Sequence, residues 1–187
     1  MAFTRRLTFD EFLALPEEKP ALELESDGTV VRKASPQGQH SRLQLAMCER
    51  INRFAEPRRL ALAFLELRVV FGGAAYVPDV SVFAWGRIPR TDEGEVANMF
   101  DSPPDIAIDI ASPEQRTNWL VRRCLSYVDK DVSIALLVNP ADRSVARFER
   151  DQTAHVLRDE DAIEFGTVLP GFSLRVAGLF SALRLER

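Results

Sequence analysis

Two aspartates lie inside short apolar stretches of this chain, and their type and position point to chemistry. Asp79 follows Pro78 in the stretch 76–83, and Asp109 lies in the isoleucine-rich stretch 103–111. Carboxylates are depleted in buried strands, because moving a charge out of water is costly unless the charge is paired or bound to a metal. The two stretches therefore suggest a site for a hard cation, or else two edge-strand acids that are solvated or paired with nearby arginines.

Alternation along the second stretch divides its side chains between two faces of a strand. Ile106, Ile108 and Ile110 fall on one face, and Asp109 shares the other face with small alanines. Small neighbours leave room beside the carboxylate, as a ligand pocket requires. Mg²⁺ prefers oxygen ligands, commonly one or two carboxylates with water and substrate phosphate. Such an ion activates water and neutralises charge on a phosphoryl group during its transfer.

The composition limits both the class of protein and the kind of site. The 187 residues, 46% hydrophobic and 28% charged, fit one soluble globular domain spanning 1–187. No membrane-spanning stretch or signal peptide is evident, which predicts a cytoplasmic protein. With only His40 and His155, and with Cys48 and Cys124 isolated from each other, the chain has no multi-histidine or zinc pattern. A metal here would need oxygen ligands.

Hydrophobic periodicity and turn residues predict an α+β (α/β-like) domain in which helices pack on a mixed central sheet. The polar segment 85–104 is long for a compact domain, which suggests a functional flap or a partner-binding loop. The predicted helices cover 8–15, 39–55, a segment that starts at Ser112, and 176–183. The predicted strands cover a hairpin of 22–24 and 29–33, then 65–71, 76–83, 103–111, 134–138, 144–148 and 155–158.

Several short motifs follow one another in an order that spans nearly the whole chain. Each is weak alone, but the order is specific. Together they are similar to the Uma-type family of restriction-endonuclease-like proteins, within the PD-(D/E)XK nuclease superfamily. The motifs are Leu7-Thr8-Phe9-Asp10-Glu11-Phe12, Leu22-Glu23, Ser35-Pro36, His40-Ser41-Arg42-Leu43-Gln44, Val77-Pro78-Asp79, Pro103-Pro104-Asp105 through Ser112-Pro113-Glu114, and Leu169-Pro170-Gly171-Phe172.

This resemblance implies a restriction-endonuclease-like fold and an endonuclease, dependent on Mg²⁺ or Mn²⁺, that hydrolyses phosphodiester bonds of DNA. It implies that Glu23, Asp79 and Asp109 converge on the metal. Taken alone, Glu23 would be a surface acid of a hairpin, and only the resemblance makes it a metal ligand. The resemblance also suggests a homodimer, which would suit the cutting of two strands.

Two departures from the family pattern affect the predicted site. Asp109 stands where the family more often has glutamate, and its shorter side chain would shift the ion. Ala111 occupies the position of the expected lysine, which in this family commonly comes from the following helix, four residues before a tyrosine. That position is Arg123, which precedes Tyr127, although helical geometry alone does not choose between Arg122 and Arg123.

An arginine in that position has a different role from a lysine. Its pKa, above about 12, prevents it from acting as a general base, but its guanidinium can hold phosphate oxygens. We therefore assign Arg123 to stabilisation of transition-state charge. Lys33, in the hairpin after Glu23, is a second candidate cation or a solvated strand lysine. His40 positions water, contacts phosphate, or is a plain histidine at a helix start.

Three functional hypotheses follow. The first is a metal-dependent endonuclease acting on DNA. The second is a weakly active or inactive nuclease-fold protein that binds nucleic acid or another partner, and the departures at 109 and 123 motivate it. The third is an unrelated α+β domain with an accidental motif match. The net charge of −4 is unlike that of a broadly basic DNA-coating surface, but a local basic groove is compatible with it.

Overall fold

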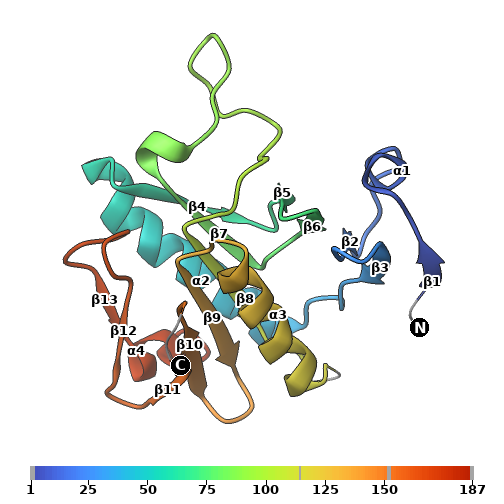
Figure 1. Ribbon diagram of the computed structural model, residues 1–187. Coiled ribbons are helices and arrows are strands. Elements are labelled where there is room, and N and C mark those ends of the chain that lie inside the picture. The colour runs from blue at the N-terminus through green and yellow to red at the C-terminus, as the bar shows by residue number, and fades with distance from the viewer. Residues whose placement is uncertain (1–2, 114, 151–152, 186–187) are drawn as a thin grey trace.

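The computed structural model describes residues 3–113, 115–150 and 153–185, so the motif residue Glu114 lies outside the described ranges. Within them the chain forms a sheet of six strands, a sheet of five strands and a separate pair of strands, with helices packed around them (Figure 1). This is the α+β arrangement that the sequence predicts. None of the described helices has the length and apolar character needed to cross a membrane.

The six-stranded sheet has the order β11-β10-β9-β8-β7-β4 and contains the segments of both aspartates. Neighbours β8 and β9 are parallel, while the other pairs are antiparallel, so the sheet is mixed. Its strands are β4 (Ala61–Leu65), β7 (Val80–Ala84), β8 (Ile106–Ile110), β9 (Ile134–Asn139), β10 (Ser144–Phe148) and β11 (His155–Arg158).

The five-stranded sheet is built mainly from the N-terminal part of the chain and brings Glu23 and Lys33 toward the larger sheet. The predicted hairpin is confirmed, because Glu23 pairs with Val31 across it. Gly28 takes a positive φ of 85° in its turn, a conformation that glycine adopts without a Cβ penalty. In the order of the sheet, its strands are β1 (Phe3–Arg6), β3 (Thr29–Arg32), β2 (Leu22–Leu24), β6 (Ala74–Tyr76) and β5 (Val69–Phe71).

Two long helices cover opposite faces of the six-stranded sheet, α2 (Gly38–Ala55) and α3 (Thr117–Asp129) (Figure 1). Ile108, with Ile106 and Ile110 on the same face of β8, packs in one core with Leu43 and Met47 of α2. Ala107, on the opposite face of β8, packs in a second core with Cys124 of α3. Residues 134–138 of β9 are apolar and buried, as expected for a strand with both faces covered.

Shorter elements complete the fold. They are α1 (Phe9–Leu13), α4 (Val176–Ser181), the 3-10 turns η1 (Glu56–Arg58) and η2 (Trp85–Arg87), and the strand pair β12 (Ala162–Glu164) and β13 (Ser173–Arg175). The segment 85–104 is largely irregular, as predicted, but it is anchored to the core. Phe100 is buried and accepts a backbone hydrogen bond from Val70, and the Phe100 ring lies 4.8 Å from that of Phe83.

Several predicted boundaries are wrong. The strand predicted over 65–71 contains the last residue of β4 and the whole of β5, divided near Glu66, whose φ is 46°. The strand predicted over 76–83 is divided between β6 and β7. The helix predicted from Ser112 begins at Thr117, because Ser112 and Gln115 close a turn with reciprocal hydrogen bonds instead of a first helical turn.

Candidate active site

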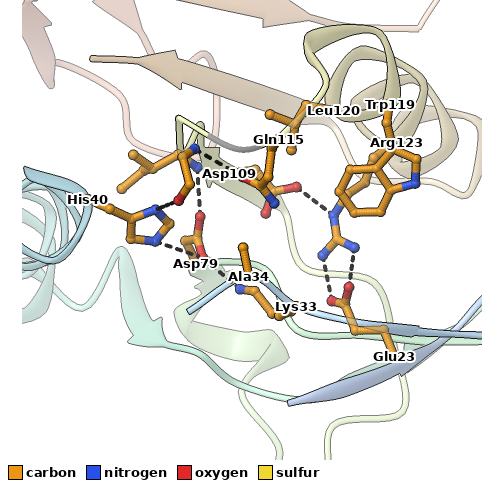
Figure 2. A pocket seen from close by; sticks show the side chains of 12 residues that line it. Glu23, Lys33, Ala34, His40, Asp79, Asp109, Gln115, Trp119, Leu120 and Arg123 are labelled. Carbon is orange, nitrogen blue, oxygen red and sulfur yellow. Dashed lines mark hydrogen bonds and ion pairs between the residues drawn. The ribbon is translucent and has the colours of Figure 1, made fainter. Parts of the chain in front are cut away.

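The structure brings all six predicted site residues to the wall of one pocket (Figure 2). They come from separate elements: β2, the residue after β3, the first turn of α2, the residue before β7, strand β8 and helix α3. The five-stranded sheet thus supplies two of them and the six-stranded sheet with its helices supplies the rest. The residues are Glu23, Lys33, His40, Asp79, Asp109 and Arg123.

Asp79 is held by three donors from three segments. Its Oδ1 accepts a hydrogen bond of 2.6 Å from Lys33 Nζ and lies 3.2 Å from His40 Nε2. Its Oδ2 accepts a 2.7 Å hydrogen bond from the backbone N–H of Ile110. Lys33 Nζ also donates to the carbonyl oxygen of Val77 at 2.7 Å. Asp79 is thereby fixed beside the strand that carries Asp109.

These contacts determine the charge states of Asp79 and Lys33. Burial alone would raise the pKa of Asp79, but the Lys33 ammonium and the hydrogen bond from His40 hold that pKa below its ordinary value. Burial alone would lower the pKa of Lys33, yet the nearby carboxylates, Asp79 first, raise it. Both groups are therefore charged at neutral pH, and Lys33 is an ammonium and not a general base.

Arg123 joins the acids of the two sheets. Its Nε donates to Asp109 Oδ2 at 2.7 Å, and its two terminal nitrogens donate to the two carboxylate oxygens of Glu23. Tyr127 also donates its hydroxyl to Asp109 Oδ2, at 3.2 Å. The structure thus chooses Arg123 over Arg122, whose side chain is exposed. Tyr127, four residues after Arg123, reaches the same carboxylate oxygen.

Aromatic rings enclose the Arg123 guanidinium. Its carbon lies 5.5 Å from the ring centroid of Tyr76 and 5.3 Å from those of Trp119 and Tyr127. A guanidinium at such distances is attracted by the ring faces. Burial alone would lower its pKa, but Asp109 and Glu23 raise the pKa well above the ordinary value. Arg123 is a permanent buried cation with three of its five N–H donors bonded to carboxylates.

Asp109 differs from Asp79 in its electrostatics. Burial raises the pKa of Asp109, Arg123 opposes this, and the charge of Asp79 adds to it. Among the described residues, the two side chains that donate to Asp109, Arg123 and Tyr127, reach the same oxygen, Oδ2. A carboxylate offers about four acceptor positions on its two oxygens. Asp109 therefore keeps acceptor capacity on Oδ1, and Asp79, with three donors, keeps one position.

The donor chemistry fits one hard cation between these two aspartates. Three carboxylates of the pocket face the Lys33 ammonium and the Arg123 guanidinium, so with all five groups ionised one negative charge is in excess. The cavity between them is about 10 Å³, close to the room that a single water molecule needs. Among the described residues there is no group of three or more histidine, cysteine or acidic side chains that could hold a metal. A site of two carboxylates and water agrees with both observations.

Sequence reasoning missed several side chains that fix this pocket. Gln44 donates from Nε2 to the carbonyl oxygen of Asp79 at 2.9 Å, and Ser112 Oγ lies 3.2 Å from His40 Nδ1. Gln44 lies four residues after His40, so helical spacing could have placed both on one face. Trp119, four residues before Arg123, could have been found by the same rule. Ser112 follows the strand and had no such signal.

Comparisons with known proteins identify the family of this chain. The model of the Uma2 family, described as "Putative restriction endonuclease", matches residues 9–177. A crystal structure from Anabaena variabilis ATCC 29413, described as a putative nuclease belonging to DUF820, is similar with a TM-score of 0.91 and 37% sequence identity. The match covers 95% of this chain and 99% of that chain. A search of curated proteins found no match. The chain therefore belongs to the Uma2 family of nuclease-like proteins, as its motifs predict.

Proposed function

We propose that this protein is a metal-dependent nuclease that hydrolyses phosphodiester bonds of DNA. The observation that supports this best is the meeting of Asp79 and Asp109 with two buried cations, Lys33 and Arg123, in one pocket. Paired carboxylates suit a divalent ion, and fixed cations suit the phosphate that such an ion would help to cleave. The family match and the nuclease-like neighbour support the same reaction class.

Asp79 and Asp109 are the proposed ligands of Mg²⁺ or Mn²⁺. When bound, the ion would supply an activated water and neutralise charge on the scissile phosphate. The resemblance also placed Glu23 on the metal. Both Glu23 oxygens accept bonds from Arg123, and Oε1 accepts a further one from the Val77 backbone. These bonds favour a positioning role for Glu23, in which it orients Arg123.

Lys33 is the proposed principal contact to the scissile phosphate. An ammonium has three donors, and those of Lys33 already have two partners, which leaves one for a phosphate oxygen. The Lys33 side chain is 12% exposed, compared with 3% for Arg123. Arg123 would add positive charge from its more deeply buried position. His40, which contacts both Asp79 and Ser112, would keep Asp79 in place.

A second candidate function is nucleic-acid binding without turnover. The observation that favours it is that every carboxylate of the pocket already has a cationic partner without a metal. In that case the fixed cations would bind backbone phosphates, with an affinity that falls steeply as salt rises. Such binding would be unaffected by Asp79→Ala.

Cleavage assays separate these two functions. We expect the wild type to cleave DNA with Mg²⁺ or Mn²⁺, and Asp79→Ala or Asp109→Ala to lose about a hundredfold or more of that activity. The exposed acid Asp101 provides the control, since Asp101→Ala should retain wild-type activity. Absence of cleavage of single-stranded, nicked and duplex DNA with either metal would overturn the nuclease proposal. Salt-dependent binding that survives Asp79→Ala would then support the second function.

The homodimer suggested by the family resemblance stays a prediction. One chain has a mass of 21.0 kDa. Light scattering of the purified protein should then give twice that mass, and a mass equal to one chain would contradict it.

A further inference from the structure

A second and larger cavity adjoins the catalytic pocket. Its volume is about 570 Å³, within the range of pockets that bind small organic ligands. It lies between the start of α2, the segment after β8 and the turn after β9. Three residues, His40, Ser112 and Gln115, line both this cavity and the catalytic pocket. A ligand in the larger cavity would therefore lie directly beside the proposed scissile phosphate.

The described part of the lining of this cavity is polar and, apart from His40, carries no ionisable side chain. Side-chain amides dominate it, and an amide both donates and accepts hydrogen bonds, as the edges of nucleobases do. The rings of two prolines add apolar surface of the kind against which the face of an unstacked base packs. The amides belong to Gln37, Gln39, Gln115 and Asn139, and the prolines are Pro113 and Pro140.

The cavity on the other side of the catalytic pocket has a different character. It has a volume of about 390 Å³ and is reached past Trp119 and Arg123. Its wall carries the carboxylates of Glu25 and Asp27 beside the guanidinium groups of Arg122 and Arg123, so it both repels and attracts a polyanion. The described lining of the 570 Å³ cavity holds no acidic side chain, so that side presents no such repulsion to a nucleic-acid chain.

We propose that the amide-lined cavity binds one unstacked nucleotide next to the scissile phosphate, so that the protein cleaves single-stranded DNA in preference to duplex. This rests on the proposed nuclease function and adds the substrate class to it. A base inside a duplex is stacked and paired, and it must be extruded before it can enter such a cavity. A base of a single strand enters without that cost.

Gly38 allows the cavity to be filled without disturbing the fold. It is the first residue of α2 and lines the cavity, and a Cβ added there would meet no atom within 4 Å. Gly38→Phe therefore places a ring at the wall of the cavity. Gly86 in η2 provides a matched control, because its added Cβ also meets nothing within 4 Å and it does not line this cavity.

The proposal is tested by cleavage assays with Mn²⁺. One labelled DNA sequence is used both as a single strand and as a duplex. We expect the wild type to cleave the single strand about tenfold faster or more. Gly38→Phe should lose about tenfold on the single strand, chiefly through a higher KM, while Gly86→Phe behaves as wild type. Bis(p-nitrophenyl) phosphate contains no base, so Gly38→Phe should lose less activity on it than on the single strand, and Gly86→Phe should hydrolyse it as the wild type does.

Three results would overturn the proposal: faster cleavage of the duplex by the wild type, wild-type cleavage of the single strand by Gly38→Phe, or equal losses in both glycine variants. If the wild type hydrolyses neither DNA nor the small diester, the nuclease function fails separately. Fluorescence anisotropy with a labelled single strand then decides the binding site. Weaker binding by Gly38→Phe alone supports the cavity, and equal binding by all three proteins overturns it.

Discussion

Arg123 shows how a buried charge becomes tolerable in this molecule. Its guanidinium forms ion pairs with Glu23 of the five-stranded sheet and with Asp109 of the six-stranded sheet, and aromatic side chains surround it. Isolated charges cannot be buried at reasonable cost, and each of these three groups depends on the others. The arginine therefore has a structural task that is separate from any contact with phosphate.

This dependence predicts a large loss of stability on removal of the arginine. Arg123→Met should lower the free energy of unfolding by about 3–5 kcal/mol, because Glu23 and Asp109 are left buried without their cation. Arg122→Met, one residue away and exposed, should change it by less than about 0.5 kcal/mol. Urea unfolding of both variants measures the difference. Equal losses would show that Glu23 and Asp109 do not depend on Arg123.

The pair of Asp79 and Lys33 predicts a pH dependence of stability. The pKa of Asp79 is lower in the folded protein than its ordinary value of 3.8, so the ionised pair stabilises the fold above about pH 4. This contribution is lost as pH falls further, toward the lower folded pKa. Lys33→Met should therefore be less stable than wild type at about pH 6, with a difference that shrinks toward about pH 2. A difference independent of pH would contradict the pairing.

At the scale of elements, Asn52 of α2 closes the edge of the larger sheet. Strand β4 is the edge strand, and the Asn52 side chain bonds both the N–H and the carbonyl oxygen of Ala63 in its middle, at 2.7 and 2.9 Å. A side-chain amide thus takes the place of a neighbouring strand. Covered edges protect sheets from pairing with other chains.

Asn52→Ala should therefore destabilise the fold and uncover the edge strand. The Ala63 N–H loses its side-chain acceptor and, among the described residues, the Ala63 carbonyl keeps only Cys48 Sγ, at 3.5 Å, so the cost is about 1–3 kcal/mol. Asn118→Ala, at an exposed position of α3, should be nearly neutral. Chemical unfolding gives the stabilities, and light scattering on warming should show earlier aggregation of Asn52→Ala. Identical unfolding curves for the two variants would contradict this role of Asn52.

Elements with strong local signals could be predicted from the sequence. The hairpin β2–β3, the helix α2 and the strands β8 to β10 follow from turn residues and hydrophobic periodicity, which act within a few neighbours. The strands β1, β12 and β13 were missed because each is three or four residues long and depends on a distant partner. The start of α3 was misplaced because the capping pattern at Ser112 also satisfies a turn.

For the whole molecule, the site residues could be named from the sequence, but their partners could not. Motif order identified Glu23, Asp79 and Asp109 as members of one site. Nothing local showed that Glu23 would meet Arg123, which lies 100 residues later in the chain. Such long-range pairing depends on how the two sheets pack, and that packing leaves no short pattern. The two cavities beside the catalytic pocket could not be predicted from the sequence for the same reason.

The excess negative charge of the pocket predicts that a divalent ion stabilises the whole protein. Binding to the folded state alone adds about 2.7 kcal/mol at one hundred times the Kd. Mn²⁺ should therefore raise the melting temperature of the wild type, and a chelator should reverse the rise. Asp79→Asn should lose the response, whereas the exposed Asp101→Asn should keep it. An unchanged melting temperature of the wild type would argue against a metal at this site.

The link between Glu23 and Arg123 also bears on the order in which the newly made chain folds. A nascent chain that ends before Thr117 contains Glu23, Asp79 and Asp109 but lacks the guanidinium that two of them require. Docking of the five-stranded sheet onto the six-stranded sheet would then bury Glu23 and Asp109 without their cation. We therefore expect the N-terminal hairpin to remain undocked until α3 has emerged from the ribosome, so that an incomplete translation product has no assembled centre.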